Sequence, residues 1–164
     1  MTSPIERIVY RSDAVALNDG PVDVSPILST SLRNNARRRL TGALALQGGT
    51  FVQVLEGDPE ALTGLMETIE ADDRHRNLRV LARWPVQVQL FLGWAMVHVD
   101  TRVLSPHHSR LLTQTGSGAQ VTSVLIDLAR ARLDPVVQAL PPLQSAQHAT
   151  QQFAGQGRSG GAQD

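Results

Sequence analysis

An amide side chain stands among large apolar residues in the stretch FVQVLEGD, residues 51–58. The β-branched and aromatic residues around it favour a strand, in which side chains alternate between two faces. Gln53 therefore shares a face with Phe51 and Leu55, and a buried amide without partners costs about 1–3 kcal/mol. Because an amide carries both a donor and an acceptor, Gln53 can relay hydrogen bonds inside a pocket. The alternative is a strand glutamine that faces solvent or bonds the backbone.

Two more polar side chains point toward the same expected pocket. Tyr10 alternates with apolar residues in IERIVYRS, residues 5–12. Asn35 falls near the apolar stripe of an expected helix, and that stripe consists of Val24, Ile27, Leu28 and Leu32. Alone, Tyr10 is typical of a protein core and Asn35 of a helix cap. Together with Gln53 they are hydrogen-bonding groups from different elements that converge between sheet and helices. This pattern is typical of a small-molecule site.

The basic clusters RNNARRR (33–39) and DDRHR (72–76) allow a phosphate site at the mouth of the pocket, because Arg matches phosphate with paired donors. Solvated helix ends are the alternative, which we favour for Arg38 and Arg39. The pair His107–His108 has no obvious third metal ligand and is expected at the surface. The sequence contains no G-x-S-x-G, H-E-x-x-H or Walker motif.

The composition narrows the function further. The 164 residues carry a formal net charge of +0 at pH 7 and 18% charged residues, which favours one domain and argues against nucleic-acid or membrane partners. Cysteine is absent, which excludes disulfides, thiolate catalysis and Cys-based zinc sites. The sequence shows neither an apolar run of about 20 residues nor a secretion signal at its start. We therefore expect a cytoplasmic protein.

The elements that must position these side chains follow from periodicity and turn residues. Gly48 and Gly49 indicate a hairpin turn, and Asp58 is expected to cap a helix that begins at Pro59. Strands are expected over residues 5–12, 40–46, 50–56, 78–86 and 90–99, and helices from Asp23–Pro26 onward and over 58–72. This order predicts an α+β, ferredoxin-like βαββαββ domain with a five-stranded mixed sheet and two helices on one face.

The last third of the sequence has a different character. Helices are expected over residues 105–113 and 119–134, and the second is apolar over an arc broad enough to pack on the open face of the sheet or on another chain. Residues 141–164 are rich in Gln, Gly, Ser and Ala and are expected to be disordered. We therefore expect a folded domain over residues 1–100, a C-terminal helical cap over 101–140, and a tail over 141–164.

Taken in order, these segments resemble the BLUF family, the blue-light sensors using flavin. The resemblance covers about residues 5–99 and rests on IVYRS (8–12), RNN (33–35), LTGAL (40–44), FVQVLEG (51–57), ADDRH (71–75) and FLGWAM (91–96). It implies a ferredoxin-like domain that holds the isoalloxazine ring of a flavin between the two helices, over the sheet. FAD is the expected cofactor, with FMN or riboflavin as alternatives, and no metal is expected.

The resemblance also implies roles for particular residues. Tyr10 resembles the family's photochemical tyrosine, Gln53 its switching glutamine, and Asn35 the asparagine that bonds the C4=O and N3 edge of the flavin. Trp94 and Met96, which share a face of the expected last strand, resemble the pair that exchanges environment during signalling. The implied flavin-binding residues are Tyr10, Ser12, Arg33, Asn34, Asn35, Gln53, Ile69, Asp72, Arg74, His75, Trp94 and Met96. Thr68 departs from the Arg that some members carry.

In the implied mechanism the excited flavin takes an electron from Tyr10 and a proton follows through Gln53. Recombination then leaves the glutamine rearranged, by rotation or by tautomerisation. The implied function is a blue-light photoreceptor, not an enzyme, of the short sensor-only type. It would form a homo-oligomer and signal to an unidentified protein partner through the last strand and the C-terminal helices. The alternatives are a small flavin-dependent oxidoreductase and a flavin-free ferredoxin-like binding module.

Overall fold

The computed structural model describes residues 4–16 and 20–132 of the chain. Five strands form one sheet in the order β4-β1-β3-β2-β5. All neighbours are antiparallel except β2 and β5, which run parallel, so the sheet is mixed. The strands are β1 (Ile5–Ala14), β2 (Thr41–Gln47), β3 (Thr50–Gly57), β4 (His75–Val86) and β5 (Val97–His98).

The register of the central strands brings the polar residues together. Tyr10 on β1 lies opposite Gln53 on β3, so both side chains emerge on the same face of the sheet. The hairpin between β2 and β3 turns at Gly48 and Gly49, whose φ angles of 55° and 78° lie in the left-handed region that glycine adopts without strain.

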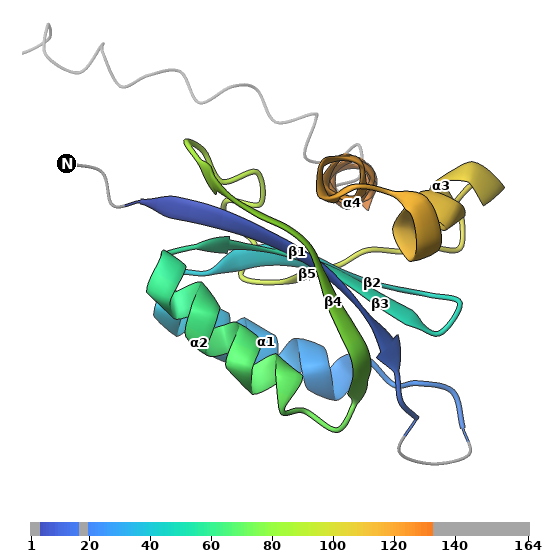
Figure 1. Ribbon diagram of the computed structural model, residues 1–164. Helices are drawn as coiled ribbons and strands as arrows, with labels where there is room; N and C mark the ends of the chain where they lie inside the picture. Colours follow the sequence, from blue (N-terminus) through green and yellow to red (C-terminus); the bar gives the residue numbers. More distant parts are fainter. Residues whose placement is uncertain (1–3, 17–19, 133–164) are drawn as a thin grey trace, which may run out of the picture. The chain divides into compact units, whose positions relative to one another are not determined.

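Helices α1 (Ser25–Arg38) and α2 (Pro59–Glu70) cover one face of the sheet (Figure 1). Asp58 caps α2, since its Oδ1 accepts from the backbone N–H groups of Glu60 and Ala61 at 3.0 Å each. The layer between these helices and the sheet is a core of buried residues: Ile8, Tyr10, Ile27, Leu40, Leu44, Phe51, Leu55, Leu62, Met66 and Met96.

The opposite face is covered by the elements that follow β5 (Figure 1). Helix α3 (Pro106–Arg110) continues into a π-helical turn, η1 (Leu111–Thr115), and α4 (Gly118–Arg132) follows. These elements close a second core with the other side of the strands: Val9, Ala43, Ala45, Val52, Val54, Phe91, Val99, Leu112, Val121, Val124, Leu125, Ile126 and Ala129. Each face of the sheet therefore has its own apolar layer.

The predicted fold class is confirmed, but the predicted strand over residues 90–99 is wrong for most of its length. Only Val97 and His98 pair with β2. Gly93 has a φ of 90°, which breaks the extended path, and the N–H groups of Leu90 and Phe91 bond the Glu56 carboxylate instead of a strand. An apolar sequence alone cannot reveal that its backbone donors are taken by a distant side chain.

No helix within the described residues combines the length and apolar character needed to cross a bilayer. The predicted tail, residues 141–164, lies outside the described residues, as does the end of the predicted C-terminal helical segment.

Candidate functional site

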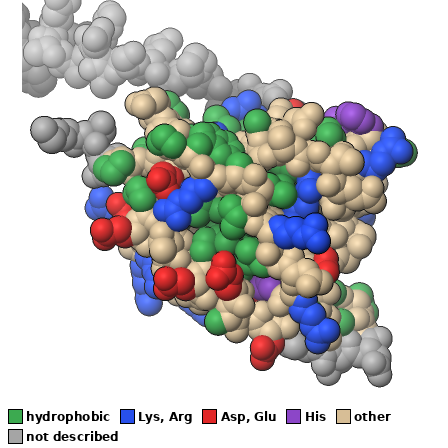
Figure 2. Space-filling view, in the orientation of Figure 1, with side chains coloured by type: hydrophobic (Ala, Val, Ile, Leu, Met, Phe, Trp, Pro, Cys, Tyr) green, Lys and Arg blue, Asp and Glu red, His purple; other side chains and the backbone are tan. Residues whose placement is uncertain are grey.

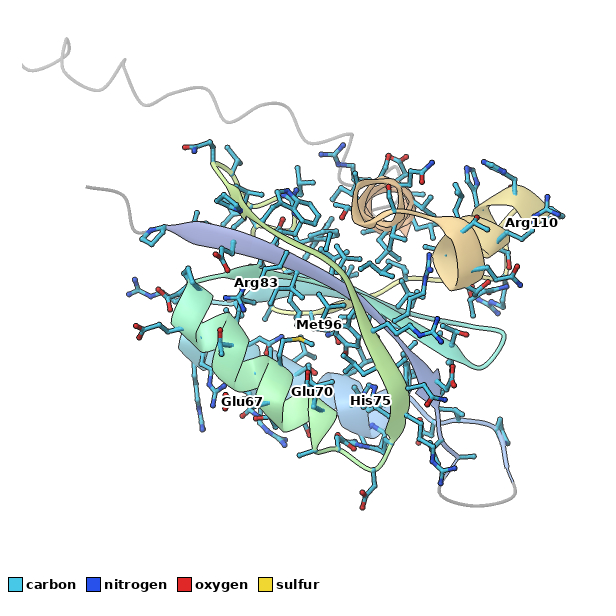
Figure 3. The ribbon with its side chains drawn as sticks, in the orientation of Figure 1. Glu67, Glu70, His75, Arg83, Met96 and Arg110 are labelled. Carbon is cyan, nitrogen blue, oxygen red and sulfur yellow. The ribbon has the colours of Figure 1, made fainter. Side chains whose placement is uncertain are left out.

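Tyr10 and Gln53 form the centre of the candidate site. Both are buried, with 0% and 4% of their surface exposed, and the Tyr10 hydroxyl donates to Gln53 Oε1. Gln53 Nε2 donates to Met96 Sδ at 3.4 Å. Met96 lies between the sheet and the two helices (Figure 3). The amide therefore has a different partner for its acceptor and for its donor, which defines its orientation.

The surroundings of Tyr10 hold a proton on its hydroxyl. Burial raises the pKa of the phenol far above its ordinary value of 10.0, and the negative charge of Asp72 raises this pKa further. Tyr10 is therefore a protonated donor over the physiological pH range.

His75 closes one end of the site. Its Nδ1 lies 2.8 Å from Ser12 Oγ, and its ring is 4.9 Å from that of Phe51, measured between centroids. Desolvation lowers the pKa of His75 below its ordinary value of 6.5, and Arg74 adds to this, while Asp72 opposes it. Since β4 begins at His75, the turn after α2 directs this side chain back toward the sheet (Figure 3).

The side-chain amide of Asn35 on α1 has a hydrogen-bond partner for its nitrogen but none for its oxygen among the described residues. Its Nδ2 donates to the Ala95 carbonyl at 2.9 Å. Its Oδ1 is buried and has no hydrogen-bond partner among the described residues. A buried acceptor without a donor is costly, so its presence indicates that something else donates to it.

These groups line one cavity between α1, α2 and the sheet. It measures about 80 Å³ and is lined by Tyr10, Ile27, Thr30, Ser31, Asn34, Asn35, Gln53, Leu65, Thr68, Ile69, Asp72, Arg74 and His75. A second cavity of about 330 Å³ shares Ile27 and Arg74 with it. Ligand pockets typically measure about 300–1,000 Å³, a range that the second cavity reaches and the first does not.

Asp72 lines the smaller cavity and pairs with Arg74, which lines both cavities. Arg74 Nε lies 2.8 Å from Asp72 Oδ1, and Arg74 Nη2 lies 2.5 Å from Oδ2. The hydrogen bond from Arg74 lowers the pKa of Asp72, which stays ionised. Much of the guanidinium that the sequence suggested for phosphate is therefore engaged by a neighbouring carboxylate.

Four predicted site residues do not line the cavity. Arg33 is exposed on α1, Ser12 lies beneath His75, and Met96 lies behind Gln53. Trp94 packs against the other core, 6.3 Å from Phe91 between ring centroids. The prediction that Trp94 and Met96 share a strand face is wrong, because residues 90–96 are not a strand and pass from one face of the sheet to the other.

The sequence reasoning also missed part of the lining. Thr30 and Ser31 lie one helical turn before Asn34 and Asn35, on the side of α1 that faces the cavity. The predicted stripe on α1 included Leu32, which is 47% exposed. The polar spacing Ser31–Asn35 was the available signal for the correct face. Ile27 and Leu65 also line the cavity and were missed, and Thr68, where some family members carry an Arg, lines it as well.

The described part of the chain gives little support for a metal site or for a strongly charged binding surface. No group of three or more His, Asp or Glu residues there could hold a metal ion. Positive and negative side chains are interspersed on the face that Figure 2 shows, and neither sign dominates. The site is therefore an apolar cavity with a few placed hydrogen-bonding groups.

Comparison with known proteins identifies the family. The family model described as "BLUF: Sensors of blue-light using FAD" matches residues 5–97. The photoactivated adenylate cyclase subunit beta of Euglena gracilis is 32% identical over 85 residues, which is 51% of this chain and 10% of that protein. The chain thus spans about a tenth of the length of this curated relative.

Solved structures agree with this family. The dark-state structure of BlrB, a BLUF protein, has a TM-score of 0.68 at 29% identity, covering 80% of this chain and 99% of BlrB. BlrP1 of Klebsiella pneumoniae, solved with FMN and cyclic diGMP, has a TM-score of 0.58 at 28% identity, covering 85% of this chain and 38% of that one. The family model covers more than half of the chain and the fold agrees with it, so the chain belongs to the BLUF family of blue-light sensors that use flavin.

Proposed function

We propose that this protein is a photoreceptor in which light switches the hydrogen bonds of Tyr10 and Gln53 beside a non-covalently bound flavin. The observation that carries the proposal is the buried Tyr10–Gln53 hydrogen bond, which lies in the same cavity as the unpartnered Asn35 Oδ1. A donor, a relay and an open acceptor around one apolar cavity suit a planar ligand with a polar edge.

The chain's residues fit a flavin. The imide edge of a flavin offers an N–H donor for Asn35 Oδ1, and the apolar lining from Ile27, Leu65 and Ile69 suits a flat aromatic ring. A bound flavin would supply a chromophore that absorbs blue light and accepts an electron once excited. FAD is the proposed form, in line with the family description, and FMN, which the BlrP1 structure contains, is the alternative.

The residues supply a proton path that can be reset. Tyr10 holds its proton because burial raises its pKa, and its hydroxyl donates this proton toward Gln53 Oε1. If the Gln53 amide turns over, Nε2 faces the tyrosine oxygen and Met96 Sδ loses its donor. Tautomerisation of the amide also converts its acceptor into a donor without rotation. In both cases the backbone can stay in place, so the switched state can decay thermally in the dark.

We propose that Met96 passes the change to the rest of the chain. Residues 88–98 connect the Gln53 side of the sheet to the α4 side, and residues 101–132 then cover that second side. In this proposal residues 1–100 form the sensor, residues 101–140 form the output segment, and the signal reaches a protein partner within a homo-oligomer. Such output requires an element with two arrangements that the site can bias.

A visible absorption spectrum of the purified chain before and after blue light tests the proposal. We expect flavin bands that shift to the red on illumination and return in the dark. Static flavin bands with turnover of an electron donor would favour an oxidoreductase, and a colourless protein that does not take up added flavin would favour a plain binding module. Release of the chromophore by denaturation, followed by mass measurement, distinguishes FAD from FMN and riboflavin.

A further inference from the structure

A buried carboxylate outside the cavity holds the segment that carries Met96. Glu56 near the end of β3 is 0% exposed and pairs in register with Arg7 on β1 and Thr41 on β2. Its Oε1 accepts from Arg7 Nε at 2.7 Å and its Oε2 from Thr41 Oγ1 at 3.3 Å. These contacts satisfy its charge and anchor it to the neighbouring strands.

The same carboxylate binds two consecutive backbone N–H groups of the segment after β4. Leu90 N donates to Glu56 Oε1 at 3.1 Å, and Phe91 N donates to Oε2 at 3.0 Å. A carboxylate can accept with both oxygens at once, whereas a glutamine offers one oxygen and would point an amide donor at the other N–H. This arrangement, which we name the Glu56 clasp, is therefore specific to a carboxylate.

Side-chain burial holds this segment at Phe91, which is 0% exposed in the α4-side core, but not on either side of it. Val88 and Leu92 on either side of the clasp are 66% and 73% exposed. Nearby contacts with other elements are Arg7 Nη2 to the Val88 carbonyl at 3.3 Å and Gln89 Nε2 to Thr41 Oγ1 at 3.0 Å. Arg7 and Thr41, which make these two contacts, also bond Glu56.

Beyond the clasp, the segment leads directly to the relay. Gly42 N donates to the Trp94 carbonyl at 3.1 Å, and Asn35 Nδ2 donates to the Ala95 carbonyl. The next residue is Met96, whose Sδ accepts from Gln53 Nε2. The position of Met96 therefore determines which end of the Gln53 amide faces away from Tyr10.

We propose that Glu56 is a positioning residue for the relay: by holding Leu90 and Phe91 it keeps Met96 against Gln53 and sets the resting orientation of that amide. The inference rests on the proposed function, since the orientation matters only if Gln53 switches. Loss of the clasp frees the segment, removes the bias on Gln53 and changes the lifetime of the light state.

The test compares Glu56→Gln with Arg7→Met in the full chain with flavin bound. Arg7→Met removes the ion pair and the contact of Arg7 with the Val88 carbonyl, but it leaves the carboxylate on both backbone amides. We expect hydrogen exchange at Leu90 and Phe91 to be about tenfold faster in Glu56→Gln, and dark recovery to change by about fivefold or more. In Arg7→Met, hydrogen exchange at Leu90 and Phe91 and the rate of dark recovery should both stay close to those of the wild type. The amide of Val99, which bonds the Leu44 carbonyl, is the internal reference.

Two further variants separate positioning from general loss of stability. Leu125→Ala destabilises the chain from the α4 side and should leave dark recovery unchanged. If Glu56→Gln does not fold because Arg7 is left unpaired, the double variant Arg7→Met/Glu56→Gln removes both charges and takes its place. Unchanged exchange at Leu90 and Phe91 overturns the clasp, and faster exchange with wild-type recovery overturns the positioning role.

A readout that needs no light distinguishes this inference from the proposed function. The methyl resonance of Met96, assigned with Met96→Leu, should shift in Glu56→Gln and stay in place in Arg7→Met. If wild type shows no photocycle, the proposed function fails, but a shifted Met96 resonance still supports the clasp as the positioning contact. An unshifted resonance overturns it.

Discussion

On the α4 side of the sheet the paired strands β1 and β3 present Val9, Val52 and Val54, whereas on the α1–α2 side the same two strands present Tyr10, Ser12 and Gln53. Both sides are buried, but the polar groups on the two sides differ in their hydrogen-bond partners. On the α4 side the polar residue to compare is Arg11. It donates to backbone carbonyls of η1 and of the residue after it, including those of Leu111 at 2.5 Å and Gly116 at 2.9 Å. The Leu111 carbonyl also accepts from the Gly116 N–H, so Arg11 adds further donors at this turn and ties β1 to η1 as a structural contact.

The α1–α2 side leaves one buried acceptor open, the Asn35 Oδ1 atom, among the described residues. A polar group that is fully bonded within the chain serves stability, while one that is held in place but left open is available to a ligand. The comparison therefore separates a structural face from a binding face, although both belong to the same strands.

The largest expected effect comes from removing the proton donor of the binding face. Tyr10→Phe keeps the ring and the packing but removes the hydroxyl that donates to Gln53. We expect flavin to bind and the light-induced red shift to be absent, as measured by difference spectroscopy. A normal shift in this variant would contradict the role of Tyr10.

A matched pair of core truncations compares the two faces directly. Leu62 on α2 and Leu125 on α4 are each 0% exposed, and truncation of such a leucine to alanine costs about 2–5 kcal/mol of stability. We expect denaturant unfolding to show a loss in this range for both variants. Flavin release should be faster only in Leu62→Ala, because that residue belongs to the core around Tyr10. Equal effects on flavin release would remove the distinction between the faces.

The open acceptor gives a smaller and more local effect. Asn35→Ala should weaken flavin binding by about 1–3 kcal/mol, the usual cost of leaving a buried polar partner unpaired. A fluorescence titration with flavin measures this change. Arg33→Ala is the control, since Arg33 is exposed on the same helix and does not line the cavity. Equal losses in the two variants would argue against the special role of Asn35.

The smallest effect concerns pH. Desolvation lowers the pKa of His75 in the folded chain below its value of 6.5 in the unfolded chain, so the unfolded state binds the proton more readily. The stability that follows is fully present above pH 6.5 and is lost as the pH falls through the folded-state pKa. The unfolding temperature of the wild type should therefore fall more steeply below pH 6.5 than that of His75→Gln. Parallel pH profiles would show that His75 does not contribute.

Much of the fold could be predicted because its signals are local. The Gly48–Gly49 turn, the Asp58 cap and the alternation of β1 and β3 depend on neighbours in sequence, and the structure contains all of them. The alternation also placed Tyr10 and Gln53 on one face. The spacing of α1 was misread because Leu32 is apolar yet exposed, while the polar Ser31 faces the cavity.

The sequence by itself determined the order of the elements, the faces of the central strands and the family, since periodicity, turns and motif spacing are properties of the chain alone. The tertiary structure decided the path of residues 90–96, the separation of Trp94 from Met96, and the pairing of Arg74 with Asp72. The physical reason is competition for hydrogen bonds. The Glu56 carboxylate, brought close by folding, takes the backbone donors of Leu90 and Phe91 that a strand would have used.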